Sequence, residues 1–248
     1  MKTTLLRLFF LLLVGDVPGQ VEASRWKDDF SDPGTLAKNW TVSGFLASSE
    51  DKNPLGKPVA GAEARSDWWQ IVDGALRGQS FPEEKHSSGI SHAVGGKDLR
   101  LNCRFKIPKS GRAGMSFRGE NPIVERNFTV AAIFIYEDGV RAIDNDVAVP
   151  KGSSGAIAMA DKGEWNRRFF TAKAAKWPIA PDVWHDFSME IKGRELTASV
   201  DGRRILIYTT LCGDVAKTSL GLGVGDDPAR RVVLATWYDD VSVEPVDR

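Results

Sequence analysis

Cysteine, histidine and net charge are all scarce in this chain, and each scarcity argues against a class of function. Its 248 residues include two cysteines and three histidines, and 33 basic side chains balance 33 acidic ones. The sequence contains no CxxC pair and no cysteine–histidine spacing typical of a metal site. Lysine and arginine are scattered and form no basic block of the kind that binds nucleic acid or an anionic membrane surface. We therefore expect no nucleic-acid partner and no cysteine-based metal module.

The sequence does not decide whether the two cysteines are free thiols or form a disulfide. Cys103 lies in an alternating apolar series that points it into a core, where a free thiol behaves as a small apolar side chain. An oxidising compartment would also permit a bridge to Cys212, but sequence spacing does not give the Cα separation that a disulfide requires.

Long apolar runs are absent except at the N-terminus. Leu5–Val14 is almost wholly apolar, Lys2 and Arg7 are the early charges, and residues 21–23 place small side chains where a signal peptidase cleaves. The run is far shorter than the ~20 residues of a membrane helix. The pattern predicts a signal peptide over residues 1–23, a secreted or periplasmic protein, and no transmembrane segment in the mature chain.

Strand periodicity dominates the remaining residues, 24–248. Leu99–Ile107 alternates apolar and polar side chains, and Phe128–Tyr136 is nearly all apolar, as in a central strand. Asp201-Gly202 separates two alternating runs, which is a strong hairpin signal. No segment has sustained helical periodicity. About a dozen short strands predict one all-β domain, a two-sheet sandwich or a barrel.

Five segments then occur in a recognisable order: WQIVDGALRG at 69–78, LRLNCRFKI at 99–107, GMSFRG at 114–119, WHDFSMEIKG at 184–193 and YDDVSV at 238–243. Over residues 26–245 this order resembles secreted bacterial members of the concanavalin A-like lectin/glucanase superfamily. The nearest resemblance is to the 3-keto-disaccharide hydrolase domain and to laminin-G-like domains. It implies an antiparallel jelly-roll sandwich whose concave face commonly meets carbohydrate.

The paired acids of glucanases in this superfamily, in a pattern such as E-x-D-x-E, are missing. Asp144-Asn145-Asp146 has two acids at strand spacing but no third, which argues against a retaining glucanase. A hydrolase of the resembled kind would cleave a glycosidic bond next to an oxidised sugar carbon by elimination and hydration. That chemistry needs a base and a group that polarises an oxygen.

The candidate catalytic residues are therefore His86 as the base, Arg118 as the oxygen-polarising group, and the acids Glu120 and Asp144. Each also has a structural interpretation. Asp144 suits a turn, Arg118 suits a surface ion pair with Glu120, and no acid partner for His86 is visible in the sequence.

Residues 44–66 and 144–182 are predicted to be long loops, which are often functional in compact β domains. Trp165 and Trp177 lie in the second and are the candidate carbohydrate-stacking residues, although tryptophans also cover sandwich cores. Asp240 in the last strand is a candidate ligand for a structural Ca²⁺, the only cofactor expected, and Asp28, Asp29 and Asp32 are possible companions.

Three functions remain open from the sequence. The first is a carbohydrate-active enzyme of the 3-keto-disaccharide hydrolase kind. The second is a non-catalytic lectin-like module that binds glycans. The third is a structural envelope protein that uses the fold for protein contacts. A carbohydrate ligand is expected in the first two.

Overall fold

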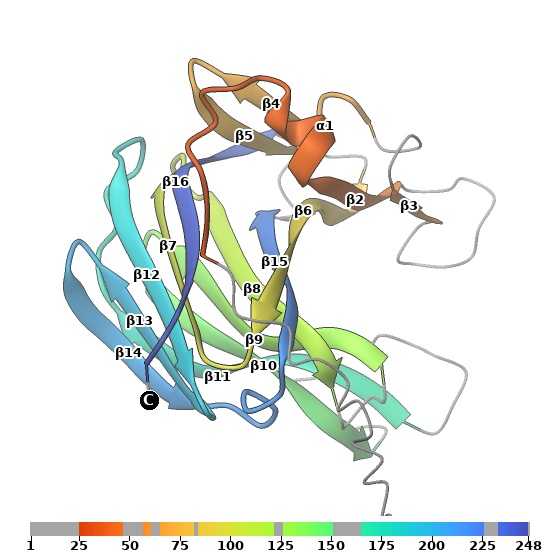
Figure 1. Ribbon diagram of the computed structural model, residues 1–248, viewed down its shortest axis with the longest axis vertical. Coiled ribbons are helices and arrows are strands. Elements are labelled where there is room, and N and C mark those ends of the chain that lie inside the picture. The colour runs from red at the N-terminus through yellow and green to blue at the C-terminus, as the bar shows by residue number, and fades with distance from the viewer. Residues whose placement is uncertain are drawn as a thin grey trace, which may run out of the picture.

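The computed structural model describes residues 25–46, 57–60, 65–81, 84–121, 126–150, 165–225 and 233–247, and nearly all of its regular elements are strands. They form two eight-stranded sheets, and the strand pairs described in both are antiparallel. The sheets stack as a sandwich (Figure 1). The predicted all-β jelly-roll fold is confirmed. The predicted signal peptide, residues 1–23, lies outside the described residues.

Sheet A has a central strand that comes last in the chain. Its order is β14 (Arg203–Thr209), β13 (Glu195–Val200), β12 (His185–Lys192), β7 (Leu99–Lys106), β16 (Leu234–Pro245), β5 (Ala75–Ser80) and β4 (Trp69–Val72). The short β1 (Trp26–Asp28) also pairs with β16, and a five-residue helix, α1 (Thr35–Asn39), follows it.

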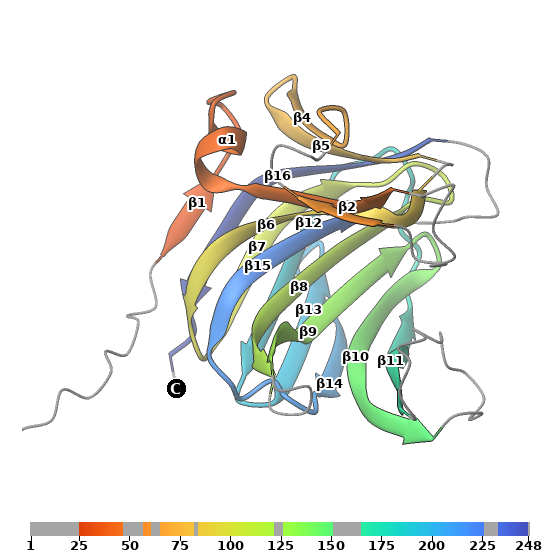
Figure 2. The same ribbon diagram turned by 90° about the vertical axis from the view of Figure 1, so that its right-hand side faces the viewer.

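Sheet B carries the strands that matter most for the site. Its order is β11 (Trp165–Lys176), β10 (Gly139–Pro150), β9 (Arg126–Tyr136), β8 (Arg112–Asn121), β15 (Lys217–Val224), β6 (Glu84–Gly96), β2 (Thr41–Leu46) and β3 (Lys57–Ala60). Figure 2 shows β6, β15, β8, β9 and β10 side by side, with strands of sheet A behind them.

The core lies between the sheets and follows the predicted alternation. In β7 the side chains of Leu99, Leu101, Cys103 and Phe105 are buried, and the residues between them are only partly so. Cys103 and Cys212 are both buried and unbridged, so the thiol interpretation is confirmed. Burial raises the pKa of the Cys103 thiol, which keeps it protonated and unreactive.

The predicted Asp201-Gly202 hairpin is confirmed. Val200 pairs with Arg203, and the two turn residues have φ of 50° and 73°, the left-handed conformation that Asp and Gly tolerate. The Asp201 carboxylate also contacts a buried histidine, His185. His185 is buried because Nδ1 lies 2.8 Å from Asp201 Oδ2 and Nε2 lies 3.1 Å from the carbonyl oxygen of Ala180.

The predicted loops are shorter than expected. Strand β11 and the end of β10 occupy much of 144–182, and parts of β2 and β3 occupy 44–66. The alanine-rich segment before Pro178 is part of strand β11 and pairs with β10, although alanine favours helices, because tertiary pairing overrides local propensity. Within the described ranges no helix has the length and hydropathy to cross a membrane.

Candidate functional site

The outer face of sheet B includes a patch of glycines where no side chain covers the backbone, and we call this patch the floor. Strand register aligns Gly114 of β8, Gly223 of β15 and Gly89 of β6 in one row, with Phe134 of β9 at one end and Ser43 of β2 at the other. Directly opposed residues share a face of the sheet. Because three neighbours in the row have no side chain, a hollow of about 170 Å³ opens there.

Gly223 is the open point of this floor. A Cβ placed on Gly223 would meet no atom within 4 Å. A Cβ on Gly114 would lie 3.2 Å from the ring of Phe134, and one on Gly221 would lie 2.7 Å from Ser116 Oγ. An aromatic ring and a hydroxyl therefore border a patch of uncovered backbone, which a flat ligand could approach closely.

Strand periodicity explains why the glycines face outward. In β15 the side chains of Leu220, Leu222 and Val224 are buried in the core, so the alternate Gly221 and Gly223 lie on the opposite face. The hollow is thus part of the sheet itself and does not depend on loop conformation.

A buried tyrosine of sheet A supports the floor from beneath. The Tyr238 hydroxyl donates to the carbonyl oxygen of Gly223 at 2.6 Å and accepts from the backbone N–H of Gly114 at 3.1 Å. Burial raises the pKa of Tyr238, so the hydroxyl keeps its proton.

Two arginines lie at the two ends of the hollow. The Arg112 guanidinium stacks over Phe134, with Cζ 4.3 Å from the ring centroid, and its Nη2 donates to the carbonyl oxygen of Val224 at 3.3 Å. Arg118 is exposed, and among the described residues its side chain makes no hydrogen bond or ion pair. The alternative considered above, a surface ion pair between Arg118 and Glu120, is absent from the described structure, so within it the guanidinium is open to a ligand.

Among the side chains that the structure describes, Arg118 is the one predicted catalytic residue in the lining of the hollow. Glu120 is exposed further along β8 and is not part of the lining. Asp144 is buried, and its Oδ2 accepts from Tyr208 Oη and from the backbone N–H of Leu211, both at 2.9 Å. That carboxylate ties β10 to β14, and this geometry supports a structural role for Asp144.

The side chains of His86 and Trp165 lie outside the described residues. The backbone of His86 is part of β6, opposite Phe45 and three residues before Gly89 in the strand that supplies the floor. The half-buried Trp177 lies away from the hollow and stacks with Arg203, whose Cζ is 4.5 Å from the ring centroid.

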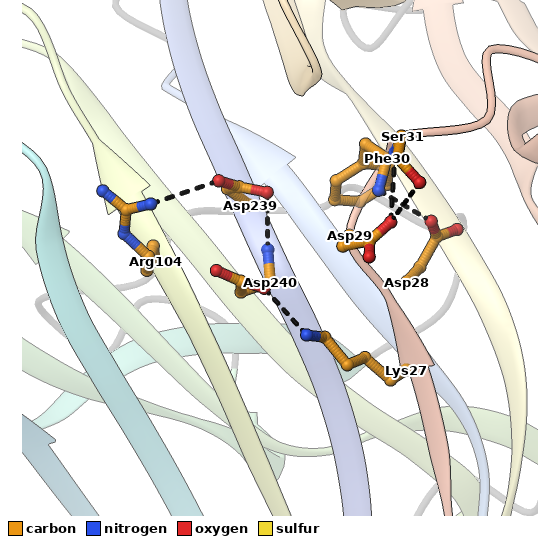
Figure 3. A network of polar contacts seen from close by, with 8 residues as sticks. All are labelled: Lys27, Asp28, Asp29, Phe30, Ser31, Arg104, Asp239 and Asp240. Carbon is orange, nitrogen blue, oxygen red and sulfur yellow. Dashed lines mark hydrogen bonds and ion pairs between the residues drawn. The ribbon is translucent and has the colours of Figure 1, made fainter.

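The Asp240 carboxylate, a candidate Ca²⁺ ligand, forms an ion pair with a lysine side chain. Figure 3 shows its carboxylate facing Lys27 of β1, and the two atoms are 2.9 Å apart. Asp240 has φ of 48° in a bulge of β16, and the adjacent Asp239 lies 3.3 Å from Arg104. Burial raises the pKa of Asp239, as does the nearby charge of Asp240.

The possible companions of Asp240 are engaged elsewhere. Asp28 accepts from Trp40 Nε1 at 3.0 Å, Asp29 accepts from Ser31 and Asp32 binds Lys38. In the described part of the chain no group of three or more His, Cys, Asp or Glu side chains could hold a metal ion. These residues do not fit a Ca²⁺ site, because each carboxylate already has a protein partner.

Sequence reasoning missed Gly223, Ser116 and Phe134. The alternation Gly221-Leu222-Gly223-Val224-Gly225 was visible, and in a strand it places every glycine on one face. The matching positions of Gly89 and Gly114 were not visible, since the register between strands distant in sequence is a tertiary property.

The chain belongs to a known family. Residues 25–243 match the model of the 3-keto-alpha-glucoside-1,2-lyase-like domain, also called the 3-keto-disaccharide hydrolase domain, so the resemblance inferred from the ordered motifs is confirmed. A comparison with curated proteins finds no match.

Solved structures share the fold at low sequence identity. LamA of Zobellia galactanivorans, crystallised with laminaritriose and laminaritetraose, matches with a TM-score of 0.56 and 14% identity over 88% of this chain and 97% of LamA. Alginate lyase AlyC3, in complex with dimannuronate, matches with a TM-score of 0.56 and 12% identity over 89% of this chain and 96% of the lyase chain. A sialidase matches with a TM-score of 0.57 and 12% identity over 93% of this chain, which spans only 19% of the sialidase.

Proposed function

We propose that this protein binds a 3-keto-glycoside in the hollow of sheet B and cleaves its glycosidic bond. The observation that carries the proposal is the open backbone floor at Gly223, bordered by Phe134 and Ser116. The guanidinium of Arg118 also lines the hollow, and among the described residues it has no hydrogen-bond or ion-pair partner. A floor without side chains suits a flat pyranose ring, and the family to which the chain belongs is named for a 3-keto-glucoside lyase.

Elimination is the reaction that this setting would favour. A ketone at C3 acidifies the proton on C2, so a base removes that proton and the electron pair is delocalised onto the C3 oxygen as an enolate. The C1–O bond then breaks, the leaving alcohol takes up a proton, and a C1=C2 double bond remains. Addition of water, with OH to C1 and H to C2, gives net hydrolysis.

Arg118 would stabilise the enolate oxygen, because a guanidinium donates charge-assisted hydrogen bonds to an oxyanion. The described lining of the hollow contains no carboxylate and no imidazole. His86, in the strand that supplies Gly89, remains the candidate base.

The same lack of acids and imidazole in the described lining favours one alternative, a module that binds glycans without cleaving them. Turnover separates the two. The purified chain would be incubated with a 3-keto-glucoside and with the unoxidised glucoside, and the products separated by chromatography; calorimetry would measure binding.

Turnover of the keto substrate alone, lost in Arg118→Ala and Gly223→Leu, would support the proposal. Arg204→Ala is the matched control, because Arg204 is exposed on β14 and, in the described structure, makes no side-chain contact with the hollow. Binding without turnover would assign the binding module, and neither binding nor turnover would leave the structural role.

We also propose that the protein is exported, on the evidence of the apolar N-terminal run. N-terminal sequencing of protein recovered from outside the cytoplasm would test it. A mature chain beginning near Ser24 is expected, and intact protein retained in the cytoplasm would contradict the proposal.

A further inference from the structure

Tryptophans and cations alternate on the outer face of sheet A, on the side of the sandwich opposite the hollow. Strand register places Gln70 of β4, Arg77 of β5, Trp237 of β16 and Lys106 of β7 in one row across four adjacent strands. Trp184, immediately before β12, extends it. We call these five residues the Trp–cation row.

Direct contacts hold the row together. Lys106 Nζ lies between two indoles, 4.7 Å from the ring centroid of Trp237 and 5.1 Å from that of Trp184. Arg77 Cζ lies 5.7 Å from the Trp237 centroid, and Arg77 Nη2 donates to Gln70 Oε1. These contacts keep the long side chains flat on the sheet, so each of the five is only half-buried.

The row itself contains two cations and no acidic side chain. In the described structure neither Arg77 nor Lys106 forms an ion pair. The nearest acid along β16, Asp239, lies in the adjacent row and is paired with Arg104 at 3.3 Å. In the third outward-facing row from the Trp–cation row, Arg100 forms ion pairs with both Glu190 and Glu244.

From these contacts we infer that the Trp–cation row is a binding surface for an acidic polysaccharide, separate from the hollow. Indole faces pack on the apolar faces of sugar rings, and the intervening cations pair with carboxylate or sulfate groups. Strands lie about 4.8 Å apart, so the row is roughly 19 Å long and several consecutive sugars of an extended chain would cover it. Arg77 and Lys106 have no ion-pair partner among the described residues, and two cations in a chain with no net charge favour an acidic glycan over a nucleic acid.

The test measures binding, so its result does not depend on turnover in the hollow. Polygalacturonate and alginate serve as acidic probes, dextran as the neutral probe and a single-stranded oligodeoxynucleotide as the other polyanion. Affinity electrophoresis and calorimetry at two salt concentrations give the affinities. We expect binding to the acidic polysaccharides only, weakened by salt.

Lys106→Gln is expected to lower the affinity about five-fold, and Trp184→Ala by a similar factor. Lys192→Gln is the matched control, because it removes one charge from the far end of β12 in the same sheet. Gly223→Leu, which fills the hollow, should bind the acidic probes like the wild type. Thermal melting checks that each variant is folded.

Any of four outcomes would overturn the inference, and the first three concern the acidic probes, the other probes and the row variants. They are failure of the wild type to bind either acidic polysaccharide, equal binding of dextran or the oligonucleotide, and unchanged affinity in both Lys106→Gln and Trp184→Ala. Loss of binding in Gly223→Leu would place the polymer in the hollow instead.

Discussion

The Tyr238 hydroxyl lies 2.6 Å from the carbonyl oxygen of Gly223, so a side chain of sheet A hydrogen-bonds to the floor of the hollow in sheet B. Replacing Tyr238 with Phe keeps the ring and removes this bond. The buried backbone groups of Gly114 and Gly223 would lose a partner, at a cost of about 1–3 kcal/mol in the free energy of unfolding.

Tyr238→Phe should also weaken ligand binding in the hollow, because the floor loses its support. Urea unfolding and calorimetry measure the two effects. Tyr208→Phe is the control. It removes the hydrogen bond that the Tyr208 hydroxyl donates to Asp144, which lies away from the floor. Equal affinity in wild type and Tyr238→Phe would mean that the floor is rigid without the bond.

Gly223→Ala should leave stability within about 0.5 kcal/mol of the wild type, because the added Cβ meets open space. Gly119→Ala, on the neighbouring strand β8, should cost about 2 kcal/mol, because its Cβ would overlap the carbonyl oxygen of Ala216. Thermal melts measure both. A ligand affinity that drops in Gly223→Ala despite unchanged stability would locate the ligand on the floor.

Asp144→Asn should lower the free energy of unfolding by about 2 kcal/mol and leave turnover of a folded sample unchanged. The reason is that Oδ2 of this buried carboxylate accepts two hydrogen bonds, from Tyr208 and Leu211. The measurement is turnover well below the melting temperature of the variant. A large fall in turnover without a fall in melting temperature would restore a catalytic role to Asp144.

Lys217 should make stability depend on pH in the alkaline range. Its side chain is buried, Nζ donates to the carbonyl oxygens of Lys97 and Gly213, and burial lowers its pKa to about 8. In the unfolded chain a lysine has a pKa of about 10.4. Between these values the unfolded state binds more protons, so the contribution of Lys217 to the free energy of unfolding rises with pH.

Lys217→Met removes this titration. The stability of the wild type relative to Lys217→Met should therefore increase by roughly 2 kcal/mol between pH 8 and pH 10, and should be constant from pH 6 to pH 7. Denaturant unfolding at each pH gives the difference. A difference that stays flat up to pH 10 would show that the Lys217 pKa is not lowered.

Local patterns predicted local structure well. The alternation of Leu99–Ile107 and the Asp201-Gly202 turn depend on neighbouring residues, and both appear as expected. The roles of Asp144 and His185 depend on partners from distant strands or turns, Tyr208 and Asp201, which no local pattern reveals. The row of glycines could not be predicted for the same reason. Its alignment depends on the register of three strands, β8, β15 and β6, that are not consecutive in the chain.

The position of β16 has a consequence for how the domain folds. This strand joins β7 on one side to β5 and β1 on the other, and Trp26 pairs with Val243. Before β16 is in place, sheet A consists of separate pieces with unpaired edges. Assembly of sheet A therefore needs pairings between residues far apart in the sequence, and such long-range pairings should make the domain fold slowly.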